Sequence, residues 1–219
     1  MKLQHPLERL KVNMTQGFGG SKSSTKAFYE ELGLKGHNGV DWGGNGRTVM
    51  TANDGEVESW VGADGDGYKG NRCMRVWDYS NNIMTFYCHL REFTVANGAI
   101  IKAGDKIAIS NNTGKYTTGA HLHFGVYELT RSGNIKNYDN GYHGAVDPDP
   151  YLALELKDGD LIKCLGDPMV YIMKNGQKWW FKNEESFKNW FGYSVSKAKI
   201  IPIDNITRNY YPYGGAIGK

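Results

Sequence analysis

The chain has 219 residues and a formal net charge of +3, with 40% hydrophobic and 22% charged residues. This length can hold one domain of medium size and a second, smaller one. So weak a basic balance gives no support for binding to nucleic acid, and no apolar run approaches the roughly 18 residues of a membrane span. We therefore expect a protein with no nucleic-acid partner and no membrane span, whose oligomeric state stays open.

The first predicted elements are a helix and a turn that leads into a strand. Ser and Thr residues precede Ala-Phe-Tyr-Glu-Glu-Leu, and Gly33 follows it, so the pattern predicts a helix over Ser24–Leu32. In Gly-His-Asn-Gly-Val-Asp-Trp at 36–42, the two glycines argue against a helix and favour a turn running into a strand. This segment places His37 and Asp41 in one short stretch of chain.

Residues 40 to 130 contain short β-type runs that are separated by turn signals. The runs are Val57–Val61, Met74–Asp78, Ile83–His89, Lys106–Ile109 and His121–Tyr127. Asn, Asp and Gly residues supply the breaks, at 53–55, 64–67, 81–82, 103–105 and 112–114. The pattern predicts a mainly antiparallel β-sheet. Asp-Gly-Asp-Gly at 64–67 lacks the rest of a calcium loop, so we expect a plain turn there.

Four of the six histidines fall in these segments, and their arrangement indicates a metal site. Residues two apart in a strand point to the same side, so His121 and His123 share one face. With His37, Asp41 and His89, they supply imidazole and carboxylate groups. Two imidazoles and one carboxylate leave a fourth, open position on a divalent ion for water, which implies catalysis. Because the helical motif His-Glu-x-x-His is absent, the remaining histidines are the candidates for acid–base work.

A series of short motifs then points to a family. The motifs are Thr-Gln-Gly-Phe-Gly at 15–19, His-Asn-Gly-Val-Asp-Trp at 37–42, Tyr-Cys-His-Leu at 87–90, Thr-Gly at 113–114 and Gly-Ala-His-Leu-His-Phe at 119–124. In order and spacing they resemble the M23 zinc endopeptidases of the lysostaphin and LytM type, over roughly residues 10 to 152. The resemblance implies a mainly β fold, with an antiparallel β-sheet peptidase domain and an active-site groove.

The resemblance also implies a role for five residues. In the family, the His and Asp of H-x-x-x-D and the last His of H-x-H hold one zinc ion, and these match His37, Asp41 and His123. The catalytic pair matches His89 and His121. The implied activity is zinc-dependent hydrolysis of peptide bonds in bacterial peptidoglycan, in a cross-bridge or a stem peptide.

Two tyrosines are weaker candidates for the same site. Tyr29 and Tyr116 could donate a hydrogen bond to an oxyanion, or could be ordinary rim or packing residues. Trp42, directly after Asp41, is expected to be structural.

The three cysteines, Cys73, Cys88 and Cys164, include no closely spaced pair, so free thiols are expected. Cys88 stands where the family commonly has a small residue before the catalytic His. It could be a stray zinc ligand or a small buried hydrophobe. Because a strand position beside His89 should face away from it, we expect the buried hydrophobe.

The composition changes after Asp-Pro-Asp-Pro-Tyr-Leu at 147–152, which resembles the end of the peptidase domain. We expect the peptidase domain to cover 1–155 and a small α+β module, rich in Trp, Phe and Tyr, to cover 156–219. Asn175-Gly176 predicts a hairpin, and Glu184–Phe191 a helix that ends at Gly192. The aromatic residues could bind cell wall or form the core of a small domain, and both readings stay open.

The implied substrate places the protein at the bacterial cell wall, in an extracellular, periplasmic or virion-associated setting. Met1–Leu10 contains no apolar signal-peptide region, which fits a phage lysin (endolysin), a chain trimmed of its leader or another export route. The alternative is a non-catalytic wall-binding or structural protein on the same fold. A zinc peptidase that acts on proteins is a third reading. Degenerate members of such folds typically lose ligands, so the filled metal and catalytic positions favour an enzyme.

Overall fold

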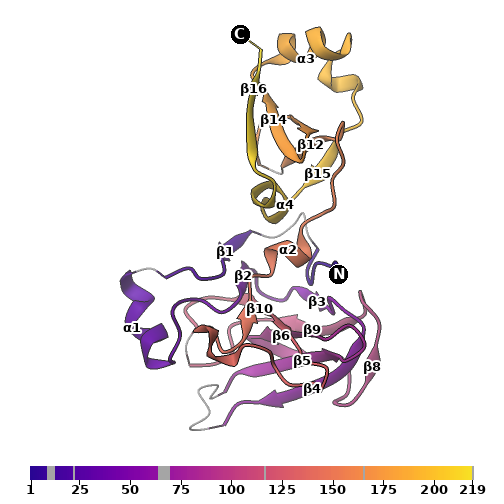
Figure 1. Ribbon diagram of the computed structural model, residues 1–219. Coiled ribbons are helices and arrows are strands. Elements are labelled where there is room, and N and C mark those ends of the chain that lie inside the picture. Colours follow the sequence, from indigo (N-terminus) through magenta and orange to yellow (C-terminus); the bar gives the residue numbers. More distant parts are fainter. Residues whose placement is uncertain (9–12, 22, 64–69, 116, 165, 219) are drawn as a thin grey trace. The chain divides into compact units, whose positions relative to one another are not determined.

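The structure is a computed structural model that describes residues 1–8, 13–21, 23–63, 70–115, 117–164 and 166–218. Contacts within the chain divide it into two compact units, Met1–Tyr151 and Leu152–Lys219 (Figure 1). The predicted boundary at 155/156 lies four residues later. The roles assigned to the two domains stay predictions.

Most strands of the first unit form one large antiparallel sheet. In the described part of the chain it has eight strands, in the order β1-β2-β10-β6-β5-β4-β8, with β11 beside β10 (Figure 1). The strands are β1 Met14–Gln16, β2 Val40–Gly43, β4 Gly55–Val61, β5 Arg72–Asp78, β6 Ile83–Cys88, β8 Ile100–Ile101, β10 His121–Glu128 and β11 Ala145–Val146. The prediction of a mainly β, antiparallel fold is confirmed.

A smaller sheet and short helices complete the first unit. The smaller sheet has the order β3-β9-β7. Its strands are β3 Thr48–Met50, β7 Leu90–Phe93 and β9 Lys106–Ser110, and the helices are α1 Ser23–Glu31 and a 3₁₀ turn, η2 Tyr138–Asn140. The short helix α2 Asp149–Leu152 includes the last residues of the first unit and the first residue of the second. Four of the predicted β-runs lie within β4, β5, β9 and β10, and the fifth, Ile83–His89, extends one residue beyond β6. Helix α1 begins and ends one residue before the predicted helix. The predicted turn at 64–67 lies outside the described residues.

Strand β10 is central to the large sheet and separates two chemical environments. Leu122, Phe124 and Val126 alternate onto one face and are fully buried. His121 and His123 therefore lie on the other face. His123 is directly opposite Asp41 of β2 on one side and Cys88 of β6 on the other. A slip of one residue would exchange the two faces, so burial of the apolar set also fixes the histidines.

The expectation of free thiols is wrong for two of the three cysteines. Cys73 and Cys88 form a disulfide between β5 and β6, with their Cα atoms 4.4 Å apart. The cause is the strand register: Met74 pairs with Tyr87, so Cys73 lies opposite Cys88 although they are 15 residues apart in sequence. Cys88 is buried as expected, but on the face that carries His123. Cys164 is a free, buried thiol.

The second unit is a small α+β module around a five-stranded sheet, counted over the described residues, with the order β15-β12-β13-β14-β16. Its elements are β12 Leu161–Cys164, β13 Tyr171–Lys174, β14 Gln177–Phe181, α3 Glu184–Phe191, the 3₁₀ turn η3 Val195–Lys197, β15 Ile201–Ile203, α4 Asn205–Tyr210 and β16 Tyr213–Ile217. Asn175 and Gly176 form the hairpin turn with positive φ angles of 51° and 70°. Asn183 caps the start of α3, and Gly192 ends it with a φ of 76°.

The aromatic residues of this unit point both inward and outward. Phe181 and Phe187 belong to a buried cluster with Leu161, Val170 and Ile172. Trp190 and three tyrosines remain substantially exposed, namely Tyr193, Tyr210 and Tyr213. The small module thus uses part of its aromatic content as a core and leaves part at the surface.

Among the helices that the structure describes, none has the length and apolar content needed to cross a membrane.

Candidate metal centre

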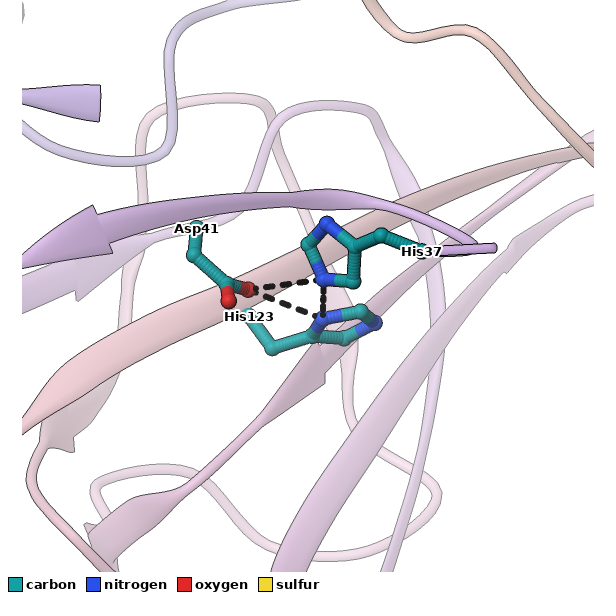
Figure 2. Close-up of side chains that lie close together, drawn as sticks. All are labelled: His37, Asp41 and His123. Atoms are coloured by element: carbon teal, nitrogen blue, oxygen red, sulfur yellow. Dashed lines mark hydrogen bonds and ion pairs between the residues drawn. The ribbon is translucent and has the colours of Figure 1, made fainter. Parts of the chain in front are cut away.

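Three predicted ligands meet on the face of the sheet that carries His123 (Figure 2). His37 precedes β2, Asp41 is the second residue of β2, and His123 is opposite Asp41 on β10. Nε2 of His37 lies 3.1 Å from Oδ1 of Asp41 and 2.9 Å from Nδ1 of His123. The third distance, between His123 Nδ1 and Asp41 Oδ1, is 3.0 Å. Two imidazoles and one carboxylate thus converge on one point.

The spacing of these three atoms suits a small divalent cation. Tetrahedral zinc with nitrogen and oxygen ligands at about 2.0–2.1 Å requires ligand atoms about 3.3 Å apart. The observed separations of 2.9–3.1 Å are slightly shorter than this. Small movements of the side chains would open the triangle to the size that zinc needs. The donor set therefore fits zinc, with the fourth tetrahedral position left to water or substrate.

Local contacts hold the ligands in this arrangement. The backbone carbonyl of Gly17 accepts a hydrogen bond from Nδ1 of His37 at 3.1 Å, which leaves a lone pair on Nε2 for a metal. Gly39 allows the chain to pass close to His123, because an added Cβ would lie 2.7 Å from the imidazole ring. A tight backbone path between His37 and β2 thus brings the chain close to His123.

Electrostatics keep Asp41 and His123 in the forms that bind metal. Burial opposes ionisation of Asp41, but its close contacts with the His123 and His37 rings outweigh burial and hold the pKa of the carboxyl far below its usual range. Burial lowers the pKa of His123, although its hydrogen bond with Asp41 acts in the opposite direction. At neutral pH the carboxylate is ionised and the His123 ring is neutral, as metal binding requires.

His89 and His121 lie beside the three ligands, with ring centroids 4.4 Å apart. Nε2 of His121 is 3.6 Å from Oδ2 of Asp41. Each ring donates from Nδ1 to a backbone carbonyl at 2.7 Å, His89 to Thr113 and His121 to Gly119. This tautomer leaves Nε2 of both rings as a proton acceptor. Burial, followed by the charge of His121, lowers the pKa of His89 to about 4, so this ring is neutral at pH 7.

Asn71 is a site residue that the sequence analysis missed. Its side-chain oxygen accepts a hydrogen bond from the backbone N–H of His89 at 2.9 Å, and the residue is only 6% exposed. His89 has a φ of +62°, which is an uncommon angle for a residue with a side chain. This backbone conformation ends β6 and turns the ring toward His121. An Asn beside a glycine before a strand is typical of a turn, so no pattern in the sequence marked Asn71.

The two candidate tyrosines have different outcomes. Tyr29 lies in α1, where its hydroxyl accepts a hydrogen bond from Gln16 at 2.6 Å and its ring centroid is 6.2 Å from that of His37. Burial raises the pKa of Tyr29, so its hydroxyl is protonated at neutral pH and able to donate. Tyr116 lies outside the described residues. Trp42 is buried next to Phe124, among core rings.

Comparison with known proteins gives one family. The sequence model of peptidase family M23 matches residues 35–139. Peptidoglycan DD-endopeptidase ShyA of Vibrio cholerae is 38% identical over 102 residues, which cover 46% of this chain and 22% of ShyA. Glycyl-glycine endopeptidase ALE-1 of Staphylococcus capitis is 34% identical over 124 residues, covering 55% of this chain and 31% of ALE-1. The chain thus spans about a fifth to a third of the length of these relatives.

A solved structure of LytU superposes with a TM-score of 0.49 and 28% sequence identity, covering 64% of this chain and 83% of the LytU chain. The matched family segment contains the three candidate metal ligands, the two histidines beside them and Asn71.

Proposed function

Because residues 35–139 of this chain belong to peptidase family M23, we propose that the protein is a zinc-dependent endopeptidase that hydrolyses peptide bonds in bacterial peptidoglycan. The observation that carries the proposal is the convergence of His37, Asp41 and His123 on one point, with His89 and His121 beside it. The names of ShyA and ALE-1 describe them as peptidoglycan and glycyl-glycine endopeptidases, which supports the substrate class.

Zinc would be held by Nε2 of His37, Oδ1 of Asp41 and Nδ1 of His123. When bound there, zinc polarises a carbonyl group and makes water more acidic. The chain's own residues then move the protons. His89 and His121 each present a basic Nε2, so the pair can take a proton from the attacking water and return one to the leaving amine. The buried Tyr29 hydroxyl, near His37, is proposed as a donor to the developing oxyanion.

The presence of all three candidate metal ligands and of both flanking histidines favours an enzyme over the non-catalytic alternative. A wall-binding or structural protein on this fold would have no need of a buried, ionised carboxylate in contact with two imidazole rings, because a buried charged group is costly unless it has a partner. Here Asp41 is 13% exposed in its side chain and is held by two rings. This arrangement is what a metal site demands.

The proposal includes action at the cell wall, in an extracellular, periplasmic or virion-associated setting. A lysin of a phage or a bacterium is one form of this proposal, and the implied substrate supports it. The aromatic surface of the second unit is proposed to hold the enzyme near that polymer, since exposed rings give a large contact area at a low cost in conformational entropy.

The decisive experiment digests purified sacculi of several cross-link types with the zinc-loaded full chain. Mass spectrometry of the new amino termini would identify the bond that is cut. We expect new peptide amino termini from at least one wall type, and none after removal of zinc with a chelator. Release of sugar reducing ends without new amino termini would contradict the proposal.

A further inference from the structure

The sheet face that carries His123 continues, two strands away, into a group of aromatic and charged side chains. Cys88 lies opposite His123, and Cys73, its disulfide partner, lies opposite Trp60 of β4. Alternation along β5 puts Arg75 and Trp77 on the same face as Cys73. Glu58 lies directly opposite Arg75. We call Glu58, Trp60, Arg75 and Trp77 the Arg75 cluster.

The guanidinium of Arg75 is held in place by its neighbours. Its central carbon is 4.7 Å from the ring centroid of Trp60 and 5.9 Å from that of Trp77. Nη1 donates to Oε2 of Glu58 at 3.3 Å, and the same oxygen accepts the indole N–H of Trp77 at 2.9 Å. The position of this long side chain is therefore already restricted before any ligand arrives, which reduces the entropy lost on binding.

The same guanidinium has binding capacity left. A guanidinium has five N–H donors, and the contact with Glu58 is the one side-chain hydrogen bond that Arg75 makes among the described residues. The Arg75 side chain is 32% exposed, and that of Glu58 is 48% exposed. A surface hollow of about 320 Å³, lined in part by Glu56, Glu58, Trp77 and Tyr79, adjoins the cluster.

A line of rings connects the cluster with the metal centre. The ring of Phe86 is 5.9 Å from that of His123 and is stacked on Trp60 at 6.0 Å. Two strand spacings across the sheet and two residues along β5 separate Arg75 from His123, or about 12 Å. An extended peptide covers this distance in three to four residues.

We propose that Arg75 binds a free carboxylate of the peptide substrate, three to four residues from the bond that is cut. The proposal rests on the proposed endopeptidase function and names a specificity determinant for it. Arg is suited to this task because its planar group binds a carboxylate through two parallel hydrogen bonds, and Glu58 uses one donor only. The carboxylate that binds Arg75 belongs to a peptide end or to an acidic side chain of the substrate. The corresponding carboxamide has the same shape without the charge and is the matched analogue.

The test compares two forms of one substrate. Cross-linked muropeptides are released from sacculi with a muramidase, and one portion is converted to carboxamides with carbodiimide and ammonium chloride. We expect the zinc-loaded full chain to prefer the free acid by about tenfold in kcat/KM, as one partly exposed charge-assisted pair would give. Arg75→Gln should remove this preference by raising KM for the acid, while kcat and zinc content stay near those of the wild type. Arg75→Lys should restore part of it.

Two further variants separate recognition from a structural ion pair. Glu58→Gln removes the carboxylate that pairs with Arg75 within the protein but leaves the guanidinium able to bind substrate, so the preference for the acid should be retained. If this variant lost the preference as Arg75→Gln does, the pair would be structural. Lys136→Gln is the matched control. It breaks the ion pair of Lys136 with Glu128, 3.0 Å long, and Glu128 alternates onto the opposite face of β10, so both substrates should be cut as by the wild type.

A binding measurement gives a readout that does not need turnover. The acid should shift the indole N–H resonance of Trp77, which is assigned by its loss in Trp77→Phe, and the amide should shift it far less. Binding of the acid without cleavage of any wall substrate would support the subsite and contradict the proposed endopeptidase. Cleavage of acid and amide at equal rates, with no difference in Arg75→Gln, would overturn the subsite and leave the endopeptidase intact.

Discussion

At the scale of single residues, the proposed function divides the site into side chains that would hold metal and side chains that would move protons. His37, Asp41 and His123 share three short contacts around one point, whereas His89 and His121 bond to backbone carbonyls through Nδ1. The two groups should therefore respond differently to substitution.

Replacing His123 or Asp41 with Ala should remove both bound zinc and activity, because each is proposed to supply one of three ligand atoms. Replacing His121 with Ala should leave zinc bound and lower kcat by roughly 10²- to 10⁴-fold, the usual contribution of general acid–base catalysis. Metal analysis and turnover are measured on the same samples. His143→Asn, which removes a histidine at a left-handed position (φ 52°) that Asn tolerates, is the control and should keep both. Equal loss of zinc in the His121 and His123 variants would contradict the division.

The pH dependence of activity follows from the His89 ring. Its pKa is lowered to about 4 from an ordinary value of 6.5, chiefly by burial. A base works only when it is unprotonated. Activity that depends on His89 should therefore be retained as the pH falls through 6.5 and should be lost near pH 4, where the ring becomes protonated. The acid limb of a kcat/KM profile on a soluble peptide measures this. A limb centred at 6.5 or above would show that His89 is not the group that titrates there.

Asn71 is expected to act as a positioning residue for His89. Asn71→Ala removes the acceptor of the His89 N–H at the point where the backbone has a positive φ, so the ring should lose its orientation. We expect kcat to fall by roughly tenfold to a hundredfold with zinc content unchanged, since small misplacements of catalytic groups have effects of this size. Asn71→Asp retains an acceptor oxygen and should recover much of the loss. If the two variants were equally impaired, the hydrogen bond would not be the cause.

At the scale of elements, the pairing of β5 with β6 brings together the residues that surround the metal centre. One register places Cys73 opposite Cys88, and Arg75 opposite Phe86. Asn71, just before β5, then reaches His89, just after β6. A hairpin between the two strands thus supports the catalytic side of the centre.

The disulfide should contribute substantially to stability. It closes a loop between residues 15 apart, and a loop of this length corresponds to about 3 kcal/mol of free energy of unfolding in the chain-entropy account. Denaturant unfolding of a double variant, Cys73→Ala with Cys88→Ala, should show a decrease of that order. A reducing agent should destabilise the wild type and leave the double variant unaffected. No difference between oxidised and reduced wild type would contradict the expected contribution.

At the scale of the whole molecule, the chain has two compact units. All five residues of the metal centre and its flanking histidines belong to the first unit. The second contributes exposed rings, including Trp190 and Tyr213, which are 48% and 56% exposed. The proposal assigns the chemistry to the first unit and attachment to the polymer to the second.

Truncation tests this division of labour. A chain of residues 1–155 should cut a small soluble peptide as the full chain does, and should lose roughly tenfold or more of its rate on whole sacculi, because tethering raises the effective concentration without changing the chemical step. The full-length double variant Trp190→Ala, Tyr213→Ala is the matched control for exposed rings and should share the defect. If the truncated chain cuts both substrates as well as the full chain, the localising role is wrong.

The sequence by itself determined the features that depend on near neighbours in the chain. Alternation in residues 121–127 predicted that His121 and His123 share a face, and the β-runs and turn signals predicted the antiparallel sheet. Asn175-Gly176 and Gly192 predicted a hairpin and the end of a helix, since positive φ angles favour those residues. The motif spacing indicated the family and hence the five residues at the centre.

Only the tertiary structure decided the features that depend on which strands pair and in which register. Cys73 and Cys88 were expected to be free thiols, and neither Asn71 nor Arg75 was marked by any motif, because no local pattern relates β5 to β6 or β4. Pairing of strands joins residues far apart in sequence, and the register is selected by burial of the whole apolar face rather than by any one motif. The same selection places the disulfide, the support of His89 and the Arg75 cluster on the face of the metal centre.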